Sequence, residues 1–311
     1  MRVFVAGATG AIGRHLVPAL LADGHQVTGT TRSPARAAGL ARLGATPAVV
    51  DGLDREAVIS AVLDARPDVI VHQMTALTGL RSFRDLDRDF AVTNELRTSG
   101  TDYLLEAAAR AGTRRVIAQG YVGWNIARTG GPVTTEQDPL DPRPVANTAT
   151  SLAAIRHVEE TVPTAVPEGL VLRYGSFYGP GSSGALLDAV RKRRLPVIGS
   201  GAGIWSFIEV GDAAAATAIA VGRGAPGIYN ITDDDPAPVN QWLPYLASCL
   251  DVRPPVRVPA WLGRILAGEL AVIQMTEVRG ASNAKARSEL GWRPQYPSWR
   301  DGFPAWVKAA P

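Results

Sequence analysis

The sequence predicts an α/β fold in which a doubly wound parallel sheet is joined to a smaller C-terminal lobe. Three observations support this prediction. A short apolar run at residues 3–6 leads into glycines at positions 7, 10 and 13. Strand-like and helix-like stretches then alternate over about the first 120 residues, the pattern of a right-handed doubly wound sheet. Residues 68–72 form an apolar run with polar ends, as expected for a strand in the middle of a parallel sheet.

The first element of the chain is a glycine-rich turn between a strand and a helix. Gly7 permits a tight turn, Gly10 leaves room for a pyrophosphate, and Gly13 lets the helix pack closely on the sheet. The positive end of that helix then faces the phosphates. The alternative is a merely tight strand-to-helix turn, but the context at the first strand favours a dinucleotide site. The predicted cofactor contacts in this turn are Gly7, Thr9, Gly10, Ala11, Ile12 and Gly13.

The remaining elements of the first half follow in order. Residues 14–22 place Leu16, Val17 and Leu20 on one helical stripe, which ends at Asp23 and Gly24. We predict strands at residues 3–6, 26–30, 46–50, 68–72 and 115–118, and helices at residues 14–22, 35–43, 54–65 and 96–111. The first half is therefore predicted to be a Rossmann-type domain.

The second half is less regular. Residues 130–144 are rich in proline, glycine and acids and are predicted to form a loop. Six of the seven tryptophans lie at Trp205 or later, which indicates an aromatic lobe over the carboxyl edge of the sheet. Further elements are predicted as helices at 151–162, 239–250 and 259–270 and a strand at 169–173. We assign the dinucleotide-binding domain to residues 1–175 and about 205–232, and a substrate-binding lobe to residues 176–204 and 233–311.

The end of the second strand indicates which dinucleotide binds. An NAD site usually has an acidic residue there, and none is present. Arg32 offers a forked cation suited to a 2′-phosphate, with Ser33 and Arg36 beside it. The alternative for Arg32 is an ordinary surface arginine. The predicted cofactor is therefore NADP(H).

Two further polar residues have open assignments. Asp51, followed by Gly52, stands where a carboxylate can meet the adenine amino group. It can instead cap the next helix, although Asp54 is better placed for that role. Asn94 can bridge the long helix to neighbouring strands or act as its N-cap.

Composition excludes several classes of function. Lys and Arg exceed Asp and Glu by 32 to 29, and the basic residues are scattered, so nucleic-acid binding has little support. The single Cys249 excludes an internal disulfide and fits a reducing cytoplasm. The four histidines are widely separated, so no metal site is predicted. No signal peptide or membrane-spanning run is recognised, and a cytoplasmic location is expected.

Motifs along nearly the whole chain resemble the extended and atypical short-chain dehydrogenase/reductase superfamily, in its NAD-dependent epimerase/dehydratase branch. The chain is most similar to NAD(P)-dependent oxidoreductases of high-GC actinobacteria. The resemblance rests on residues 7–13, 68–72, Asn94 with Thr98, 172–181, 205–210, 229–231 and 290–292. It implies further cofactor contacts near the nicotinamide from Tyr174, Ser176 and Phe177.

The catalytic pair of this family, a Tyr followed four positions later by a Lys, is missing. The family's helix signature matches residues 152–159, so Asn147 stands at the Tyr position and Ser151 at the Lys position. Neither side chain can perform the family's acid–base chemistry near neutral pH. Tyr121 lies at the position of the family's substrate-orienting hydroxyl and is the best candidate acid; its alternative is an aromatic wall beside Trp124. Tyr178 is a lesser candidate.

Two kinds of function fit these residues. The first is an NADPH-dependent oxidoreductase acting on a carbonyl or activated double bond of a small, fairly apolar molecule of secondary metabolism, with Tyr121 or water supplying the proton. The second is an NADP(H)-binding cyclase, isomerase or lyase without net redox, or a cofactor-sensing regulator. The resemblance also implies a homodimer that pairs through the helices at residues 96–111 and 151–162.

Overall fold

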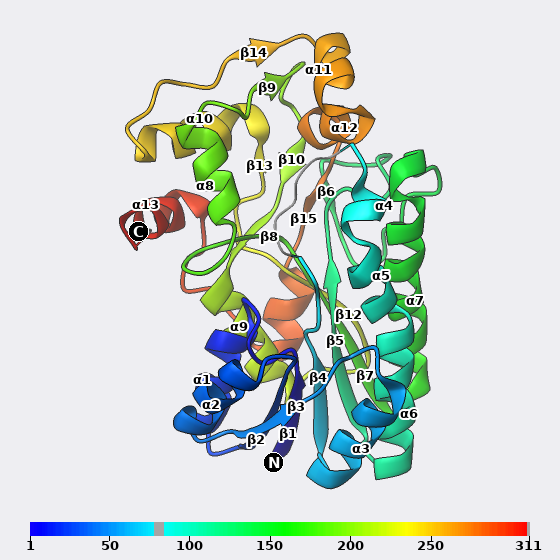
Figure 1. Cartoon of the computed structure of the whole chain (residues 1–311). Helices are drawn as coiled ribbons and strands as arrows, with labels where there is room; N and C mark the ends of the chain where they lie inside the picture. Colours follow the sequence, from blue (N-terminus) through cyan, green and yellow to red (C-terminus); the bar gives the residue numbers. More distant parts are fainter. Residues whose placement is uncertain (78–83, 310–311) are drawn as a thin grey trace.

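The computed structural model describes residues 1–77 and 84–309. Its main sheet has seven parallel strands in the order β3-β2-β1-β4-β5-β7-β12, which confirms the predicted doubly wound sheet (Figure 1). The strands are β1 (Arg2–Ala6), β2 (Gln26–Thr31), β3 (Thr46–Val49), β4 (Val69–His72), β5 (Arg115–Tyr121), β7 (Glu168–Tyr174) and β12 (Gly227–Ile231). The strand order reverses between β1 and β4, where Val5 pairs with Val71 on one side and Gly29 on the other. Ligands of such sheets bind at the carboxyl ends of the strands beside this reversal.

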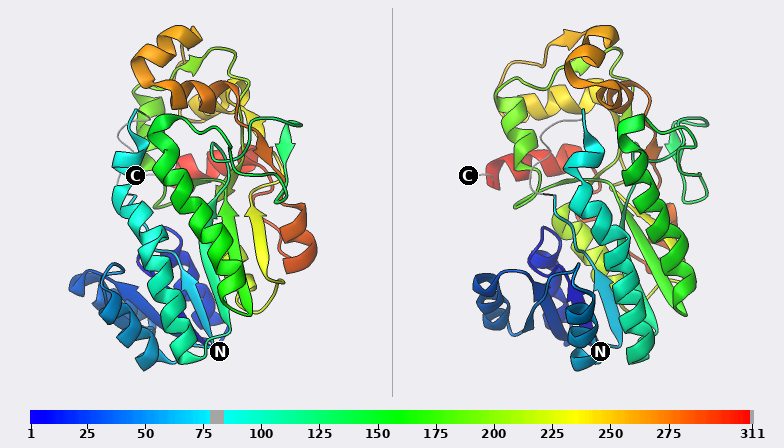
Figure 2. Two further views of the ribbon diagram at one scale, coloured as in Figure 1. Left: turned by 90° about the vertical axis from the view of Figure 1, so that its right-hand side faces the viewer. Right: turned by 45° about the vertical axis from the view of Figure 1, so that its right-hand side comes forward.

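Helices cover both faces of the sheet. One face packs on α1 (Gly13–Ala22) and α9 (Val210–Ala220). The other face packs on α3 (Arg55–Ala65), α6 (Ser99–Ala111) and α7 (Ala149–Ala165). Helices α6 and α7 run side by side along the outside of this second layer (Figure 2). The α2 helix (Pro34–Leu43) lies at the β2–β3 edge of the sheet.

The prediction of one continuous helix at residues 96–111 is wrong, because the chain forms two helices there. Two helices, α5 (Ala91–Arg97) and α6, meet at Thr98, whose φ of −91° and ψ of −88° are not helical. The Thr98 hydroxyl donates to the carbonyl oxygens of Asn94 and Glu95, an alternative bond that Thr side chains offer to a helix backbone. Asn94 therefore lies inside α5 and does not cap the longer helix.

The predicted helix at residues 259–270 is also divided. It consists of α11 (Ala260–Ala267) and α12 (Glu269–Thr276), separated by Gly268 at φ 90°. Only glycine adopts such a backbone conformation readily, so this residue ends the first helix and turns the chain.

The C-terminal part has a core of its own. Tyr178, Phe207 and Phe303 form an aromatic cluster with three tryptophans, between α8 (Gly184–Arg191), α10 (Val239–Cys249) and α13 (Trp299–Ala309). Leu290 and Trp292, although late in the sequence, are buried in the core of the main sheet. In the described part of the chain, no helix is both long and apolar enough to cross a membrane.

His72, the last residue of β4, is a titratable side chain buried in the sheet. Its Nε2 lies 3.2 Å from the Leu96 carbonyl oxygen and its Nδ1 accepts from the Met74 amide, so the ring is held neutral. Burial lowers its pKa from 6.5 to about 4, and the charge of Arg97 acts in the same direction. The unfolded chain binds this proton more readily, so the contribution of His72 to stability is complete above pH 6.5 and is lost as pH falls towards 4.

We therefore expect the wild type to lose about 2–3 kcal/mol of unfolding free energy between pH 6.5 and 4.5, relative to a His72→Gln variant. Urea denaturation of both proteins at the two pH values measures this difference. Equal losses in both proteins would show that carboxylates, and not His72, dominate the acid sensitivity.

Candidate functional site

The glycine turn at the end of β1 has no room for side chains. Gly7 has a φ of +91°, and a Cβ placed on it would lie 2.7 Å from the carbonyl oxygen of Gln73. A Cβ on Gly13 would overlap the backbone carbonyl of Ala8 and lie 2.7 Å from the Gly7 oxygen. A Cβ on Gly10 would meet only the Gly7 oxygen, at 3.3 Å, so this glycine leaves the outer side of the turn open. The turn thus has the shape that a pyrophosphate requires.

The N-terminus of α1 is free to meet an anion. Ile12, at its N-cap position, provides no side-chain cap, and the first turn contains no acidic residue. The preceding loop is held instead by β2, because the Gly7 amide donates to the Thr30 hydroxyl at 2.9 Å and Thr9 bonds to Thr31 at 3.3 Å. Unsatisfied amides and the positive helix end together fit a dinucleotide phosphate.

The predicted 2′-phosphate residues lie beside this turn. Arg32 and Arg36 are exposed, and in the described residues neither side chain has an ion pair or hydrogen bond. Ser33 caps α2, with its hydroxyl oxygen accepting from the Arg36 amide at 3.4 Å. Two available cations and a hydroxyl therefore stand where the second strand ends.

The adenine-side residues follow β3. Asp54 caps α3 by accepting from the Ala57 amide, which confirms it as the better cap. The Asp51 side chain accepts from the Leu53 amide at 3.1 Å and is exposed. Gly52 is buried, and a Cβ on it would overlap the Met74 side chain. This close approach holds Asp51 at the carboxyl edge of the sheet.

Ser151, at the predicted lysine position, is fully buried in a polar network. Its hydroxyl donates to Asp87 at 2.7 Å and accepts from the Asn94 side chain at 3.0 Å. Asp87, in the short helix α4 (Leu86–Asp89), also accepts from the amides of Thr150 and Ser151, at 3.0 and 2.7 Å. Asn94 therefore bridges α5 to α7, not to a strand. The Ser151 hydroxyl thus lies between Asp87 and an amide donor that does not release its proton, and these bonds anchor the start of α7.

Asn147, at the predicted tyrosine position, is likewise engaged in a structural contact. It lies in the 3₁₀ turn Ala146–Thr148, and its amide donates to the Arg84 carbonyl oxygen at 2.6 Å. The Arg84 side chain in turn donates to the carbonyl oxygens of Ile265 and Leu266, at the end of α11. Asn147 thus belongs to a chain of contacts that reaches the C-terminal part.

Tyr121 stands at the end of β5 and is partly buried. Burial raises the pKa of its hydroxyl, and a hydrogen bond with Ser176 opposes that rise. The hydroxyl lies against Gly123, where a Cβ would be 2.6 Å from it, and the ring is 6.4 Å from Trp124. The structure thus brings together two predicted site residues, Tyr121 and Ser176. A phenol whose pKa is raised by burial is a weak general acid.

The other two tyrosines are buried. Tyr174 is held between Gln73 at 2.9 Å and Thr217 at 2.7 Å, and burial raises its pKa to about 12. Its ring packs on Phe177 at 5.4 Å. The structure does not support Tyr178 as a catalytic candidate. This residue is fully buried in the aromatic cluster, and its hydroxyl lies against Gly302 in α13. Burial raises the pKa of Tyr178 strongly, so its role is packing.

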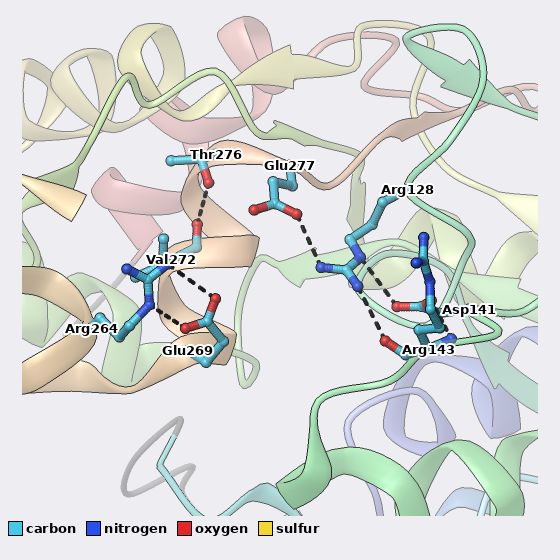
Figure 3. A network of polar contacts seen from close by, with 8 residues as sticks. All are labelled: Arg128, Asp141, Arg143, Arg264, Glu269, Val272, Thr276 and Glu277. Carbon is cyan, nitrogen blue, oxygen red and sulfur yellow. Dashed lines mark hydrogen bonds and ion pairs between the residues drawn. The ribbon is translucent and has the colours of Figure 1, made fainter. Parts of the chain in front are cut away.

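Apolar side chains and an ionic network join the C-terminal part to the Tyr121 region. Trp124, Leu152 and Leu270 form a buried cluster on which Tyr121 packs. Beside it, Arg128 pairs with Glu277 at 3.0 Å and with Asp141 at 3.3 Å, and it donates to the Arg143 carbonyl oxygen (Figure 3). Arg264 and Glu269 similarly hold α11 to α12. The wall of the site near Tyr121 is therefore aromatic and fixed by ion pairs.

Sequence reasoning missed two residues of this edge. Asp87 lies 64 positions from Ser151, and no local motif connects them. Gln73 follows β4 directly, and its side chain reaches Tyr174 across the sheet edge. The available signal for Gln73 was its position, because polar residues just after central parallel strands commonly face the ligand crevice.

A family model and three known proteins are similar to this chain. The family model described as NAD dependent epimerase/dehydratase family matches residues 3–232. A Streptomyces protein named 3-diazoavenalumate denitrifying reductase is 46% identical, over 97% of this chain and 99% of its own length. A 4-hydroxy-2-methyl-3-oxo-4-farnesyl-3,4-dihydroquinoline-1-oxide ketoreductase of Stigmatella aurantiaca is 28% identical, over 94% and 92%. The structure of Thermus thermophilus UDP-glucose 4-epimerase with NAD is 25% identical, with a TM-score of 0.77 and coverage of 99% and 98%.

Proposed function

Because the chain belongs to the NAD-dependent epimerase/dehydratase family and is an oxidoreductase, we propose that it is an NADPH-dependent reductase that removes a diazo group from a small carboxylate. The two relatives named as reductases favour redox chemistry over the non-redox and sensing alternatives. The observation that carries the proposal is the state of the two catalytic positions, where Asn147 and Ser151 make structural hydrogen bonds.

NADPH is the proposed cofactor because of the charge at the end of β2. The family is named for NAD, yet Arg32 and Arg36 stand exposed where an NAD site usually has a carboxylate. A planar guanidinium suits the 2′-phosphate of NADPH and gains nothing comparable from a ribose hydroxyl. The glycine turn and the N-terminus of α1 would hold the pyrophosphate.

Loss of the diazo group from a diazonium cation is a reduction that needs no general acid. When bound, NADPH supplies a hydride, so that R–N₂⁺ and NADPH become R–H, N₂ and NADP⁺ with no proton gained or lost. A carbonyl, by contrast, becomes an alkoxide that must be protonated. The absence of an acid at Asn147 and Ser151 is compatible with the first reaction and unfavourable for the second.

The aromatic wall has a definite part in this proposal. Diazonium ions that persist in water are conjugated to an aromatic ring, and water slowly replaces their nitrogen by a hydroxyl group. Tyr121 and Trp124, with the apolar side chains packed around them, would bind such a ring and exclude water from it. Because diazo acids are not intermediates of central metabolism, the proposal implies a secondary metabolic pathway.

We further propose a homodimer through the surfaces of α6 and α7.

A carbonyl or activated double bond is the second candidate acceptor. Tyr121 favours it, because its hydroxyl stands at the position of the family's substrate-orienting hydroxyl and lies near Ser176. The ketoreductase relative supports the same chemistry. In this case Tyr121 must donate the proton.

A Tyr121→Phe variant distinguishes the two candidates. With 3-diazoavenalumate as the probe, we expect kcat to stay within about threefold of wild type, because no proton is required. Ketone reduction through Tyr121 should fall by about a hundredfold or more. NADPH consumption measures both, with Tyr103→Phe as the matched control. A hundredfold loss with the diazo probe would contradict the proposal.

A further inference from the structure

We propose that Asp87 determines specificity by placing negative charge where the family keeps its lysine, so that the site selects a cationic acceptor group. This inference rests on the proposed function, because it concerns the same substrate site. It adds a recognition element, the charge of the acceptor, that the reductase proposal does not contain.

The contacts of Asp87 fix its carboxylate next to the lysine position. Its two oxygens accept from the Ser151 hydroxyl at 2.7 Å, the Ser151 amide at 2.7 Å and the Thr150 amide at 3.0 Å. Asn94 holds the same hydroxyl from the other side, at 3.0 Å. Four hydrogen bonds from three elements therefore restrain Asp87 and Ser151 as one unit.

The charges that flank Asp87 in the sequence balance one another. Asp85 and Asp89 stand against Arg84 and Arg88, so the net charge of residues 84–89 is the single negative charge of Asp87. The guanidinium of Arg84 is bound to the two carbonyl oxygens at the end of α11. Asp87 is partly exposed, and its carboxylate lies at the N-terminal end of α7.

The consequence is a reversal of charge relative to the family. A lysine at position 151 would carry +1 and stabilise a developing oxyanion; Ser151 with Asp87 carries −1. In a partly buried site, this reversal favours a cation and opposes an alkoxide. A diazonium is cationic, and its hydride reduction produces no oxyanion. The same carboxylate therefore favours one acceptor and disfavours the carbonyl alternative.

The test measures binding of two inhibitors that differ only in charge. We choose 4-(trimethylammonio)benzoate and 4-tert-butylbenzoate, which have the same shape, and titrate each into the NADP⁺-loaded protein by calorimetry. Wild type should bind the cation about tenfold more tightly than its neutral isostere. In Asp87→Asn the ratio should fall to about one, although the single amide oxygen can still accept from the Ser151 amide and preserve part of the helix cap.

Asp85→Asn is the matched control. It removes the same charge two residues away in the sequence, and the Asp85 side chain makes no cap hydrogen bond. It should retain the wild-type ratio. A ratio unchanged in Asp87→Asn, with both proteins folded by circular dichroism, overturns the inference. Because no turnover is measured, this result is independent of whether the diazo probe is reduced: loss of the ratio without nitrogen release would refute the reaction and retain the charge selectivity.

Discussion

Gly13→Ala is expected to abolish tight NADPH binding and to lower the free energy of unfolding by about 2–3 kcal/mol. The added Cβ would overlap the carbonyl of Ala8 and lie 2.7 Å from the Gly7 oxygen, and both are backbone atoms that cannot rotate away. Either α1 moves off the sheet or the glycine turn opens, and both changes displace the amides that face the pyrophosphate. Fluorescence titration with NADPH should show at least about a hundredfold increase in Kd.

Gly184→Ala is the control for this prediction. Gly184 is also the first residue of a helix, α8, but a Cβ on it would have no neighbour within 4 Å. This variant should bind NADPH as the wild type does. Normal NADPH binding by Gly13→Ala would show that the turn is not the phosphate site.

The second large effect is expected from Arg32→Glu. It replaces an exposed cation at the end of β2 by a carboxylate, which repels a 2′-phosphate and can accept from a ribose hydroxyl. We expect kcat/KM with NADPH to fall by about two orders of magnitude and kcat/KM with NADH to rise. Steady-state kinetics with both cofactors and the diazo probe measures the ratio.

Arg42→Glu makes the same charge change in the last turn of α2 and is the control. The ratio of kcat/KM with NADPH to kcat/KM with NADH should stay within about twofold of wild type. Residue 42 is far enough from the end of β2 for dissolved salt to screen its charge. An unchanged ratio in Arg32→Glu would assign Arg32 to the protein surface and leave NAD as the cofactor.

The parts of the fold that sequence predicts best are those specified by local patterns. Gly7 has a positive φ that glycine adopts readily, so the glycine-rich turn after β1 is visible in the sequence. All four residues of β4 are buried, so this strand appears as a short apolar run. The broken helices were missed because Thr98 and Gly268 act through a hydroxyl bond and a positive φ, and neither interrupts the apolar periodicity.

The catalytic region was harder to predict because its contacts are long-range. The substitutions at Asn147 and Ser151 are visible in the sequence, but their partners are not. Ser151 meets Asp87 across 64 residues, and Asn147 meets Arg84 across 63. Tyr178 lies close in sequence to the cofactor residues, yet the packing of Gly302 in α13 buries it. The positions of Asn147, Ser151 and Tyr178 in the sequence therefore identified them as candidates, but did not reveal which residues they contact.

The central claim is that a hydride replaces a diazo group without an acid from the protein. The most direct measurement combines the protein with NADPH and 3-diazoavenalumate labelled with ¹⁵N in the diazo group, and counts labelled N₂ against NADPH oxidised. We predict one N₂ for each NADPH, at rates that differ by no more than about threefold between wild type and Tyr121→Phe. NADPH oxidation without nitrogen release, or nitrogen release without NADPH oxidation, would contradict the account.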